Sequence, residues 1–183
     1  MELANNSYRL KKIKNKFKII TALSVFYDAK DPNQFLKDVN KLLSEDGIFL
    51  LEHADLLSIL KLKMFDTICH EHLEYYSYDS LKYLFEKNGL KIFKIEENDI
   101  NGGSYRIYCK KNISRSIVYK EKTSIFRIKK FIQRVELNKK KCLTFLTNAT
   151  KKKLKVFIYG ASTKGNTLLQ YYNINNKMIE YAA

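Results

Sequence analysis

Residues 18–53 read KIITALSVFYDAKDPNQFLKDVNKLLSEDGIFLLEH, and this stretch decides the expected fold. The apolar run Lys18–Phe26 has the length and composition of a buried strand. Asp31 and Pro32 are residue types preferred at the N-cap and the first position of a helix. A second apolar run follows at Ile48–Leu51. Strand, helix and strand at this spacing predict one right-handed crossover unit of an α/β sheet.

The rest of the chain predicts further helices and short strands. Apolar residues at three- and four-residue steps indicate a long amphipathic helix over 125–149. Its heptad-like seam would pack on its own chain or on a coiled-coil partner. The other expected elements are a short helix at Leu56–Met64, a helix capped by Ser77 or Asp79, strands at Leu90–Ile95, Ser104–Cys109 and Lys155–Tyr159, and a helix at Asn166–Tyr172.

The composition indicates a folded protein without a membrane span. Of 183 residues, 45% are hydrophobic and 13% are aromatic, which is more than a disordered chain carries. No apolar run approaches the ~20 residues that cross a bilayer, and the first residues contain no apolar core like that of a secretory signal. We therefore expect a cytoplasmic protein with no membrane partner. Three cysteines without a C-x-x-C pair indicate neither a disulfide framework nor a zinc knuckle.

The net charge of +15 raises the question of a nucleic-acid partner. The basic residues are 29 lysines and only 5 arginines, whereas arginine is the usual residue for reading bases and gripping phosphates. Lysine is accompanied by heavy use of Ile, Asn and Tyr, which are all encoded by A/T-rich codons. We interpret most of the charge as compositional drift and do not expect a nucleic-acid partner, although a lysine-rich binding module is the alternative function.

The segment Cys69–His72, CHEH, is a candidate for proton chemistry. Two imidazoles flank the Glu71 carboxylate, and such a set can take a proton near neutral pH and orient the group that takes it. His70 and His72 do not have the spacing of zinc proteases, whose two histidines lie four residues apart on a helix. A His-x-His metal site on a strand stays open, and so does a polar loop whose histidines only satisfy hydrogen bonds.

Two glycine-containing segments are weaker candidates for ligand contacts. The segment 101–106, NGGSYR, suits a hairpin turn, although its glycines would also let the backbone approach a ligand and Arg106 would hold an anion. The segment 160–167, GASTKGNT, lies between an expected strand and helix, where phosphates often bind. Asn166 stands where the phosphate loop of nucleotide hydrolases has lysine, which argues against an ATPase. A phosphate, ribose or sugar contact and a purely structural turn both stay open.

Together and in this order, these motifs resemble the S-adenosylmethionine-dependent sugar C-methyltransferases. The matching stretches are FDTICHEHLEYYS at 65–77, NDINGGSYRIY at 98–108 and YGASTKGNTLLQYY at 159–172, and residues 18–53 are similar to part of a class I methyltransferase domain. The resemblance implies an α/β fold in two parts. A partial class I methyltransferase (Rossmann-like) sheet would span 1–64, and an incomplete C-terminal Rossmann-like α/β domain with a long helix would span 65–183.

The resemblance also implies a reaction. Family members methylate a carbon of a nucleotide-linked keto-deoxysugar, by removing a proton beside the ketone and transferring a methyl group to the enolate carbon. By the motif match, His72 falls on the general base and Glu71 on its supporting carboxylate. His70 falls between them and would bind or orient the sugar.

Further positions match the binding residues of the family. The residues expected to edge the S-adenosylmethionine pocket, at the carboxyl end of the first strand, are Ser24, Val25 and Phe26. The residues expected to contact the nucleotide-sugar substrate are Cys69, Tyr75, Gly102, Gly103, Ser104, Arg106, Ser162, Lys164 and Asn166.

The chain also departs from the family pattern. The family often has tyrosine at the position of Cys69 and histidine at that of Asp28, which indicates a divergent branch. The cysteines of the family's N-terminal zinc domain and the main glycine-rich cofactor loop do not occur in this sequence. We therefore expect no metal site here and a methyltransferase fragment that works with a separate chain carrying the missing half. An inactive remnant is the alternative.

Overall fold

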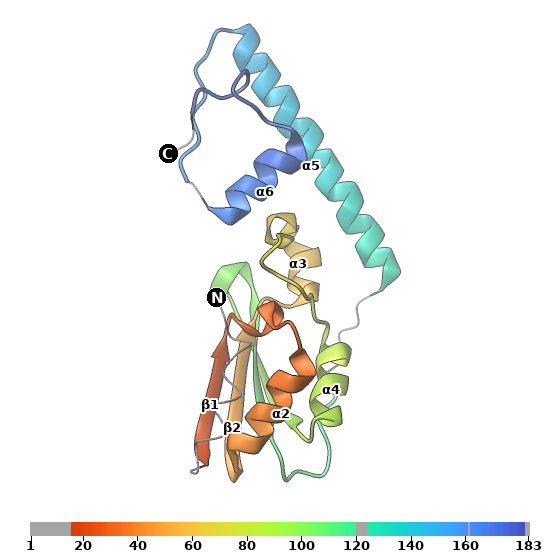
Figure 1. The fold of residues 1–183 in the computed structure, drawn as a ribbon. Coiled ribbons are helices and arrows are strands. Elements are labelled where there is room, and N and C mark those ends of the chain that lie inside the picture. The colour runs from red at the N-terminus through yellow and green to blue at the C-terminus, as the bar shows by residue number, and fades with distance from the viewer. Residues whose placement is uncertain (1–15, 120–123, 161, 182–183) are drawn as a thin grey trace. The chain divides into compact units, whose positions relative to one another are not determined.

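The computed structural model describes residues 16–119, 124–160 and 162–181. By its internal contacts the chain divides into two compact units. Unit 1 combines Met1–Ser58 with Leu73–Thr123, and unit 2 combines Ile59–His72 with Ser124–Ala183. Figure 1 shows the elements of both units, and each unit is described by itself.

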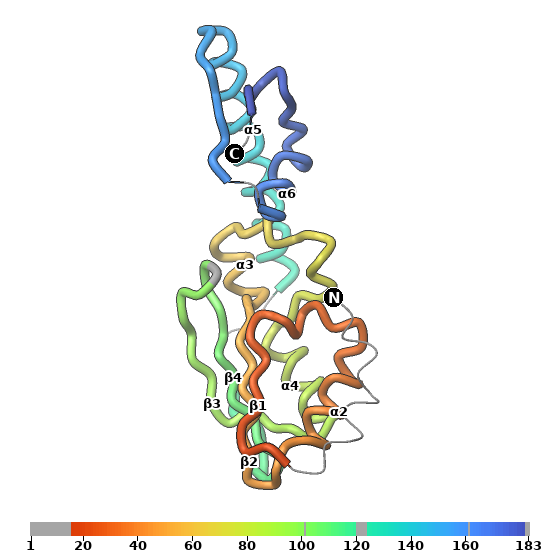
Figure 2. The backbone as a smooth tube through the Cα atoms, turned by 60° about the vertical axis from the view of Figure 1, so that its left-hand side comes forward, coloured from red at the N-terminus to blue at the C-terminus, as the bar shows by residue number. Residues whose placement is uncertain are grey.

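Unit 1 is built on a four-stranded sheet with the strand order β1-β2-β4-β3 (Figure 2). The strands are β1 (Phe17–Leu23), β2 (Leu43–His53), β3 (Lys91–Asn98) and β4 (Ser104–Lys110). β1 pairs with β2 in parallel, as the predicted crossover unit requires. β3 and β4 form the predicted hairpin, and β4 pairs with β2 in the antiparallel sense. The hairpin therefore extends the same sheet and does not begin a second one.

Two capped helices, α2 (Pro32–Leu42) and α4 (Tyr78–Lys87), lie on one face of this sheet (Figures 1 and 2). The Asp31 side chain accepts a hydrogen bond from Gln34 N at 3.0 Å and starts α2, as the sequence predicts. Ser77 starts α4 through a capping box with Ser80. The core between helices and sheet contains the fully buried side chains of Phe26, Leu36, Leu43, Phe49, Leu51, Leu81, Phe85, Leu90, Ile92 and Ile107.

The expectation that the first strand is buried is wrong. Only Ala22 of β1 is buried, whereas Ile19 is 66% exposed and Leu23 is 52% exposed. β1 lies at the edge of the sheet, where β2 is its one strand partner among the described residues. An edge strand has fewer neighbours to cover its side chains, so an apolar sequence alone does not guarantee burial.

Unit 2 contains the long helix α5 (Ile125–Lys151) and the shorter helix α6 (Thr163–Tyr172) (Figure 1). The short helix α3 (Leu56–Leu62) runs from the end of unit 1 into unit 2. The buried residues of α5 are Phe131, Val135, Leu146 and Ala149, of which the last three lie on the predicted seam. Lys139 Nζ donates to Tyr171 O at 2.8 Å and links α5 to the end of α6. The long amphipathic helix is therefore confirmed.

Two details of unit 2 differ from the sequence prediction. Lys155–Tyr159 does not form a regular strand, although Ile158 N donates to Tyr181 O at 3.0 Å and Glu180 N donates to Val156 O at 2.8 Å. These two backbone hydrogen bonds, to the segment around Glu180 and Tyr181, are too few to make a regular pair of strands among the described residues. Helix α6 begins at Thr163, three residues before the predicted start, because Ser162 caps it.

The compact units divide the chain differently from the expected boundary after Met64. The residues of β3 and β4 were assigned to a C-terminal domain that begins at residue 65. β4 pairs with β2 over five residue pairs, from Phe49↔Cys109 to His53↔Tyr105, and this pairing places the hairpin in unit 1. Backbone pairing over long sequence separations decided this boundary, and local patterns in the sequence do not report it.

Candidate functional site

A cleft in unit 2 brings together two of the motifs that the sequence singled out. It has a volume of about 540 Å³ and is lined by Ile68, Cys69, His70, Thr163, Asn166, Thr167, Gln170 and Tyr171. Cys69 and His70 belong to the CHEH segment, Ile68 directly precedes it, and the other residues belong to α6. Thr163 Oγ1 also donates a hydrogen bond to Glu71 Oε1 at 3.4 Å, across a separation of 92 residues. The structure therefore joins the CHEH segment to the GASTKGNT helix.

Aromatic rings hold the CHEH segment against α6. The Phe65 ring stacks on the Tyr172 ring with centroids 5.3 Å apart and lies 5.7 Å from the Tyr171 ring. Tyr172 is 4% exposed, so this contact is part of the packing of unit 2. Offset aromatic stacking over such distances is favourable and directional. It fixes the segment that carries the histidines relative to the helix that faces it.

The CHEH segment itself is a turn. His72 N donates to Cys69 O at 3.2 Å, which closes the turn around His70 and Glu71. His70 and Glu71 are exposed, and His72 and Cys69 are half-buried. His72 does not line the unit 2 cleft, although His70 does. In the described part of the chain, no three His, Cys, Asp or Glu side chains gather as a metal ion would need.

The start of α6 is organised by Ser162. Its Oγ accepts a hydrogen bond from Gly165 N at 3.1 Å, which is ordinary N-capping. Gly160 has φ +124°, a backbone conformation that favours glycine, and it turns the chain before the helix. Lys164, Gly165 and Asn166 therefore lie in the first helical turn instead of in a loop. Of the three residues expected here to contact substrate, Asn166 is the one that lines the cleft.

The NGGSYR segment is the turn of the β3–β4 hairpin. Gly102 and Gly103 have φ values of +88° and +127°, so both positions favour glycine. Ser104 is 2% exposed and its Oγ donates to Ile100 O at 2.8 Å, which uses the hydroxyl within the turn. The structure gives these three residues a local structural role in unit 1.

Arg106 is engaged within the sheet. Its Nε and Nη2 donate to Glu52 Oε2 at 2.9 and 2.7 Å, and Glu52 is 5% exposed. The bond to Glu52 raises the pKa of the Arg106 guanidinium. The Arg106 charge is therefore paired with the buried Glu52 carboxylate within the sheet, and a substrate contact by Arg106 stays a prediction.

The expected cofactor residues follow β1 at its carboxyl end. Ser24 N donates to Glu52 O at 2.8 Å, and Ser24 has φ +53°, an uncommon value for a residue other than glycine. Val25 is half-buried. The Phe26 side chain is fully buried and packs against Phe35 with ring centroids 5.3 Å apart. Phe26 thus offers a ligand its backbone but not its side chain.

The sequence analysis missed a set of buried polar side chains in unit 1. His53, Asp55 and Tyr76 are 1%, 1% and 5% exposed. Desolvation by burial lowers the pKa of His53 to about 4 and raises the pKa of Tyr76. The available signal was the position of His53 and Asp55 directly after a buried strand, at the edge where α/β sheets bind ligands. Tyr75, which we did expect to bind substrate, is half-buried.

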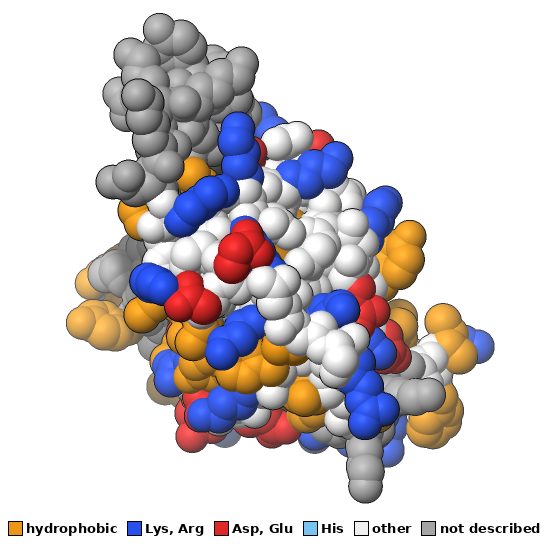
Figure 3. All heavy atoms as spheres, turned by 90° about the horizontal axis from the view of Figure 1, so that it is seen from below, with side chains coloured by type: hydrophobic (Ala, Val, Ile, Leu, Met, Phe, Trp, Pro, Cys, Tyr) orange, Lys and Arg blue, Asp and Glu red, His pale blue; other side chains and the backbone are white. Residues whose placement is uncertain are grey.

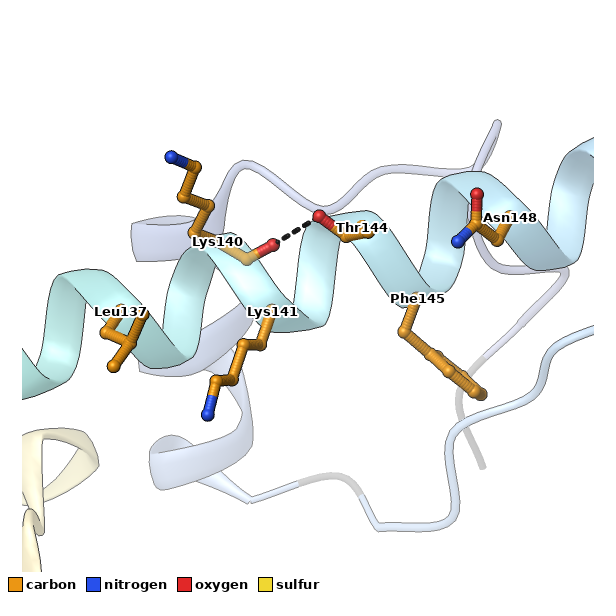
Figure 4. Close-up of a pocket in the computed structure, with 6 residues that line it drawn as sticks. All are labelled: Leu137, Lys140, Lys141, Thr144, Phe145 and Asn148. Carbon is orange, nitrogen blue, oxygen red and sulfur yellow. Dashed lines mark hydrogen bonds between the residues drawn. The ribbon is translucent and has the colours of Figure 1, made fainter.

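A second hollow lies on one helix and contains none of the predicted site residues. It follows α5 along Leu137, Lys140, Lys141, Thr144, Phe145 and Asn148 (Figure 4). Leu137, Lys141 and Phe145 point to one side of the helix, whereas Lys140 points away from them (Figure 4). Thr144 Oγ1 donates to Lys140 O at 2.9 Å, within the helix itself. The polar groups along this hollow are two lysines, a threonine and an asparagine.

The positive charge is dispersed on the face that Figure 3 shows. Lys and Arg side chains lie there beside Asp and Glu side chains and do not form one uninterrupted basic patch. Two exposed ion pairs in unit 1, Lys18–Asp46 and Lys94–Glu96, have the same mixed character. No helix in the described part of the chain combines the length and the apolar character that crossing a bilayer would take.

Comparison with known families agrees with this architecture. The family described as "Methyltransferase domain" matches residues 4–95, which is half of the chain. The family described as "C-methyltransferase C-terminal domain" matches residues 99–183. The chain therefore belongs to the methyltransferase family, and its C-terminal part is similar to the C-terminal domain of C-methyltransferases.

A curated relative makes the likeness more particular. The chain is 36% identical over 92 residues to the C-methyltransferase NovU of Streptomyces niveus, and the match covers 50% of this chain and 22% of NovU. The chain thus spans about a fifth of the length of this relative.

Two solved methyltransferase structures resemble part of the chain. The magnesium protoporphyrin IX methyltransferase of Synechocystis PCC 6803 is 13% identical with a TM-score of 0.42, covering 55% of this chain and 47% of that chain. The complex of the Haloferax volcanii Trm112 methyltransferase activator with a methyltransferase gives 13% identity and a TM-score of 0.45, covering 56% and 58%.

Proposed function

We propose that this chain is part of an S-adenosylmethionine-dependent C-methyltransferase that acts on a nucleotide-linked keto-deoxysugar. The observation that carries the proposal is the cleft of unit 2, where Cys69 and His70 face Asn166 of α6. The likeness to a C-methyltransferase over half of the chain supports the reaction class. The protein would act in the cytoplasm.

In the proposed reaction, His72 removes a proton from the carbon beside the sugar ketone. The C–H electron pair becomes the enolate, whose carbon forms the new C–CH₃ bond. S-adenosylmethionine supplies the methyl group as its S–CH₃ bond breaks, which leaves S-adenosylhomocysteine and a protonated base. A base is useful in this step when its pKa lies near the operating pH, as an imidazole's does.

The neighbours of His72 suit supporting roles. Glu71 is oriented by the hydrogen bond from Thr163 Oγ1, and such an anchor would hold the carboxylate beside the histidine that follows it. His70 lines the cleft with polar groups of α6 and would contact sugar hydroxyls. The backbone of 24–26, at the carboxyl end of β1, would edge the cofactor. No group in this scheme requires a metal.

The test is methyl transfer from labelled S-adenosylmethionine to a nucleotide-linked keto-deoxysugar, with the chain mixed with an upstream segment that carries a glycine-rich loop. His72→Ala should lower turnover at least about a hundredfold while cofactor affinity is unchanged, since general-base catalysis contributes on that scale. Lys177→Ala, at the far end of the chain, is the matched control and should keep full turnover. Full turnover by His72→Ala would remove His72 from the base role.

A further inference from the structure

Three buried polar side chains lie together at the carboxyl end of β2, and the proposed reaction uses none of them. The His53 and Tyr76 rings meet edge to face with centroids 6.1 Å apart. Leu56 N donates to Tyr76 O at 3.0 Å, which fastens the segment after β2, with Asp55 in it, against Tyr76. All three residues belong to unit 1. They therefore form one cluster, which we call the β2-end cluster.

The tautomer of His53 follows from its one hydrogen bond. Nδ1 lies 2.8 Å from Ala54 O, and a carbonyl oxygen can only accept, so Nδ1 carries the proton. Nε2 of the neutral ring then presents a bare lone pair. This atom is buried and has no hydrogen-bond partner in the described part of the chain. His53 therefore offers an acceptor that needs a donor.

Asp55 and Tyr76 each add another unused polar atom. Asp55 Oδ1 accepts from Ser58 N at 2.9 Å, but Oδ2 is buried and lacks a partner among the described residues. The Tyr76 ring stacks on Phe26 with centroids 5.2 Å apart, and its hydroxyl is likewise buried without a described partner. Buried polar atoms are nearly always hydrogen-bonded in folded proteins, so three together in one place call for an occupant.

We propose that the β2-end cluster is a binding site for one hydroxyl group, supplied by a water molecule or by an alcohol group of a ligand. A bound water molecule donates its two protons to Nε2 of His53 and Oδ2 of Asp55, and its oxygen accepts from the Tyr76 hydroxyl. An alcohol has one O–H proton, so it donates to one of the two acceptors, and the Tyr76 hydroxyl donates to the alcohol oxygen or to the other acceptor. Two buried acceptors in the cluster disfavour a phosphate or a carboxylate, which would itself need donors. The proposal does not depend on the proposed function.

A tyrosine variant separates an occupied cluster from an empty one. If the cluster is empty, Tyr76→Phe removes an unsatisfied buried hydroxyl, and the equilibrium constant for unfolding stays the same or falls. If the cluster holds a hydroxyl group, the variant loses a hydrogen bond and this constant rises about five- to tenfold. The matched control is Tyr78→Phe, which loses a bond that the structure shows, from Tyr78 OH to Ile117 O. A Tyr76→Phe variant as stable as the wild type would overturn the proposal.

Nitrogen NMR of the unmodified chain tests the same site without relying on a variant's stability. The chain has three histidines, so its imidazole spectrum is simple. We expect the spectrum to show His53 as the Nδ1–H tautomer. We also expect one of two further signals, which are cross-relaxation between the His53 ring and water, or a saturable change in the Nε2 chemical shift when ¹³C-methanol is added. The first signal identifies water as the occupant and the second identifies a ligand alcohol. An Nε2–H tautomer, or neither signal, would refute the site.

Discussion

Arg106 directs Nε and Nη2 to a single oxygen, Oε2 of Glu52, at 2.9 and 2.7 Å across the antiparallel pair of β4 and β2. Asn98 Nδ2 donates to the same oxygen at 3.2 Å from β3. Three strands thus converge on one buried carboxylate. A buried charge is tolerated only when it is paired and hydrogen-bonded, so Arg106 is needed by the sheet whether or not a ligand is bound.

Removing the guanidinium should destabilise the fold through the partner that remains. Arg106→Ala leaves the buried Glu52 carboxylate without its charge partner, and we expect the free energy of unfolding to fall, because a buried charge is tolerated only when it is paired. Urea denaturation measures this loss. The double variant Arg106→Ala, Glu52→Gln should recover part of it, because the uncompensated charge is gone. If the single variant is as stable as the wild type, the ion pair does not support the sheet.

Acid should destabilise unit 1 through His53. Burial lowers the pKa of His53 from 6.5 to about 4. As the pH falls, this histidine is therefore protonated in the unfolded chain before it is protonated in the folded chain. The contribution of His53 to the free energy of unfolding is complete above about pH 6.5 and is lost as the pH falls toward 4. The loss is about 2 kcal/mol at pH 5 and about 3 kcal/mol over the whole window. Urea denaturation at about pH 7 and pH 5 measures the difference. His53→Gln should flatten this dependence, and the exposed control His70→Gln should preserve it.

The cap of α6 should be worth a measurable amount of stability. Ser162→Ala deletes the hydroxyl that accepts from Gly165 N, and we expect a loss of about 1 kcal/mol. Amide hydrogen exchange along α6 localises the effect to unit 2. Ser162→Asp keeps an acceptor at the N-cap and is the matched control, which should retain protection. Equal protection in the alanine variant would show that the cap contributes little.

The three cysteines should react with thiol reagents at different rates. Cys109 is fully buried in β4, and burial raises the pKa of its thiol, whereas Cys69 and Cys142 are half-buried. Because the thiolate is the reacting form, we expect Cys109 to be labelled only on unfolding. Timed labelling with Ellman's reagent, with Cys109→Ala to assign the slow phase, measures this. Rapid labelling of Cys109 in the native chain would contradict its placement in the core.

Several elements could be predicted because their causes are local. Asp31 before Pro32 and Ser77 before Tyr78 start helices through contacts within one turn. The glycine pair at 102–103 makes the hairpin turn because of its own backbone freedom. Predictions that depend on which distant segments a side chain contacts were less accurate. β1 was expected to be a buried strand, but most of its side chains are exposed.

The sequence by itself determined the helix caps, the hairpin turn and the long helix, since these depend on neighbours within a few residues. It also predicted the crossover unit, from two apolar runs on either side of a capped helix. Tertiary structure alone decided that Glu71 meets Thr163, that Arg106 pairs with Glu52, and that β3 and β4 join the first sheet. It also decided that His53 is buried as a neutral ring. These features arise from contacts between distant segments, whose partners are fixed by how the whole chain packs.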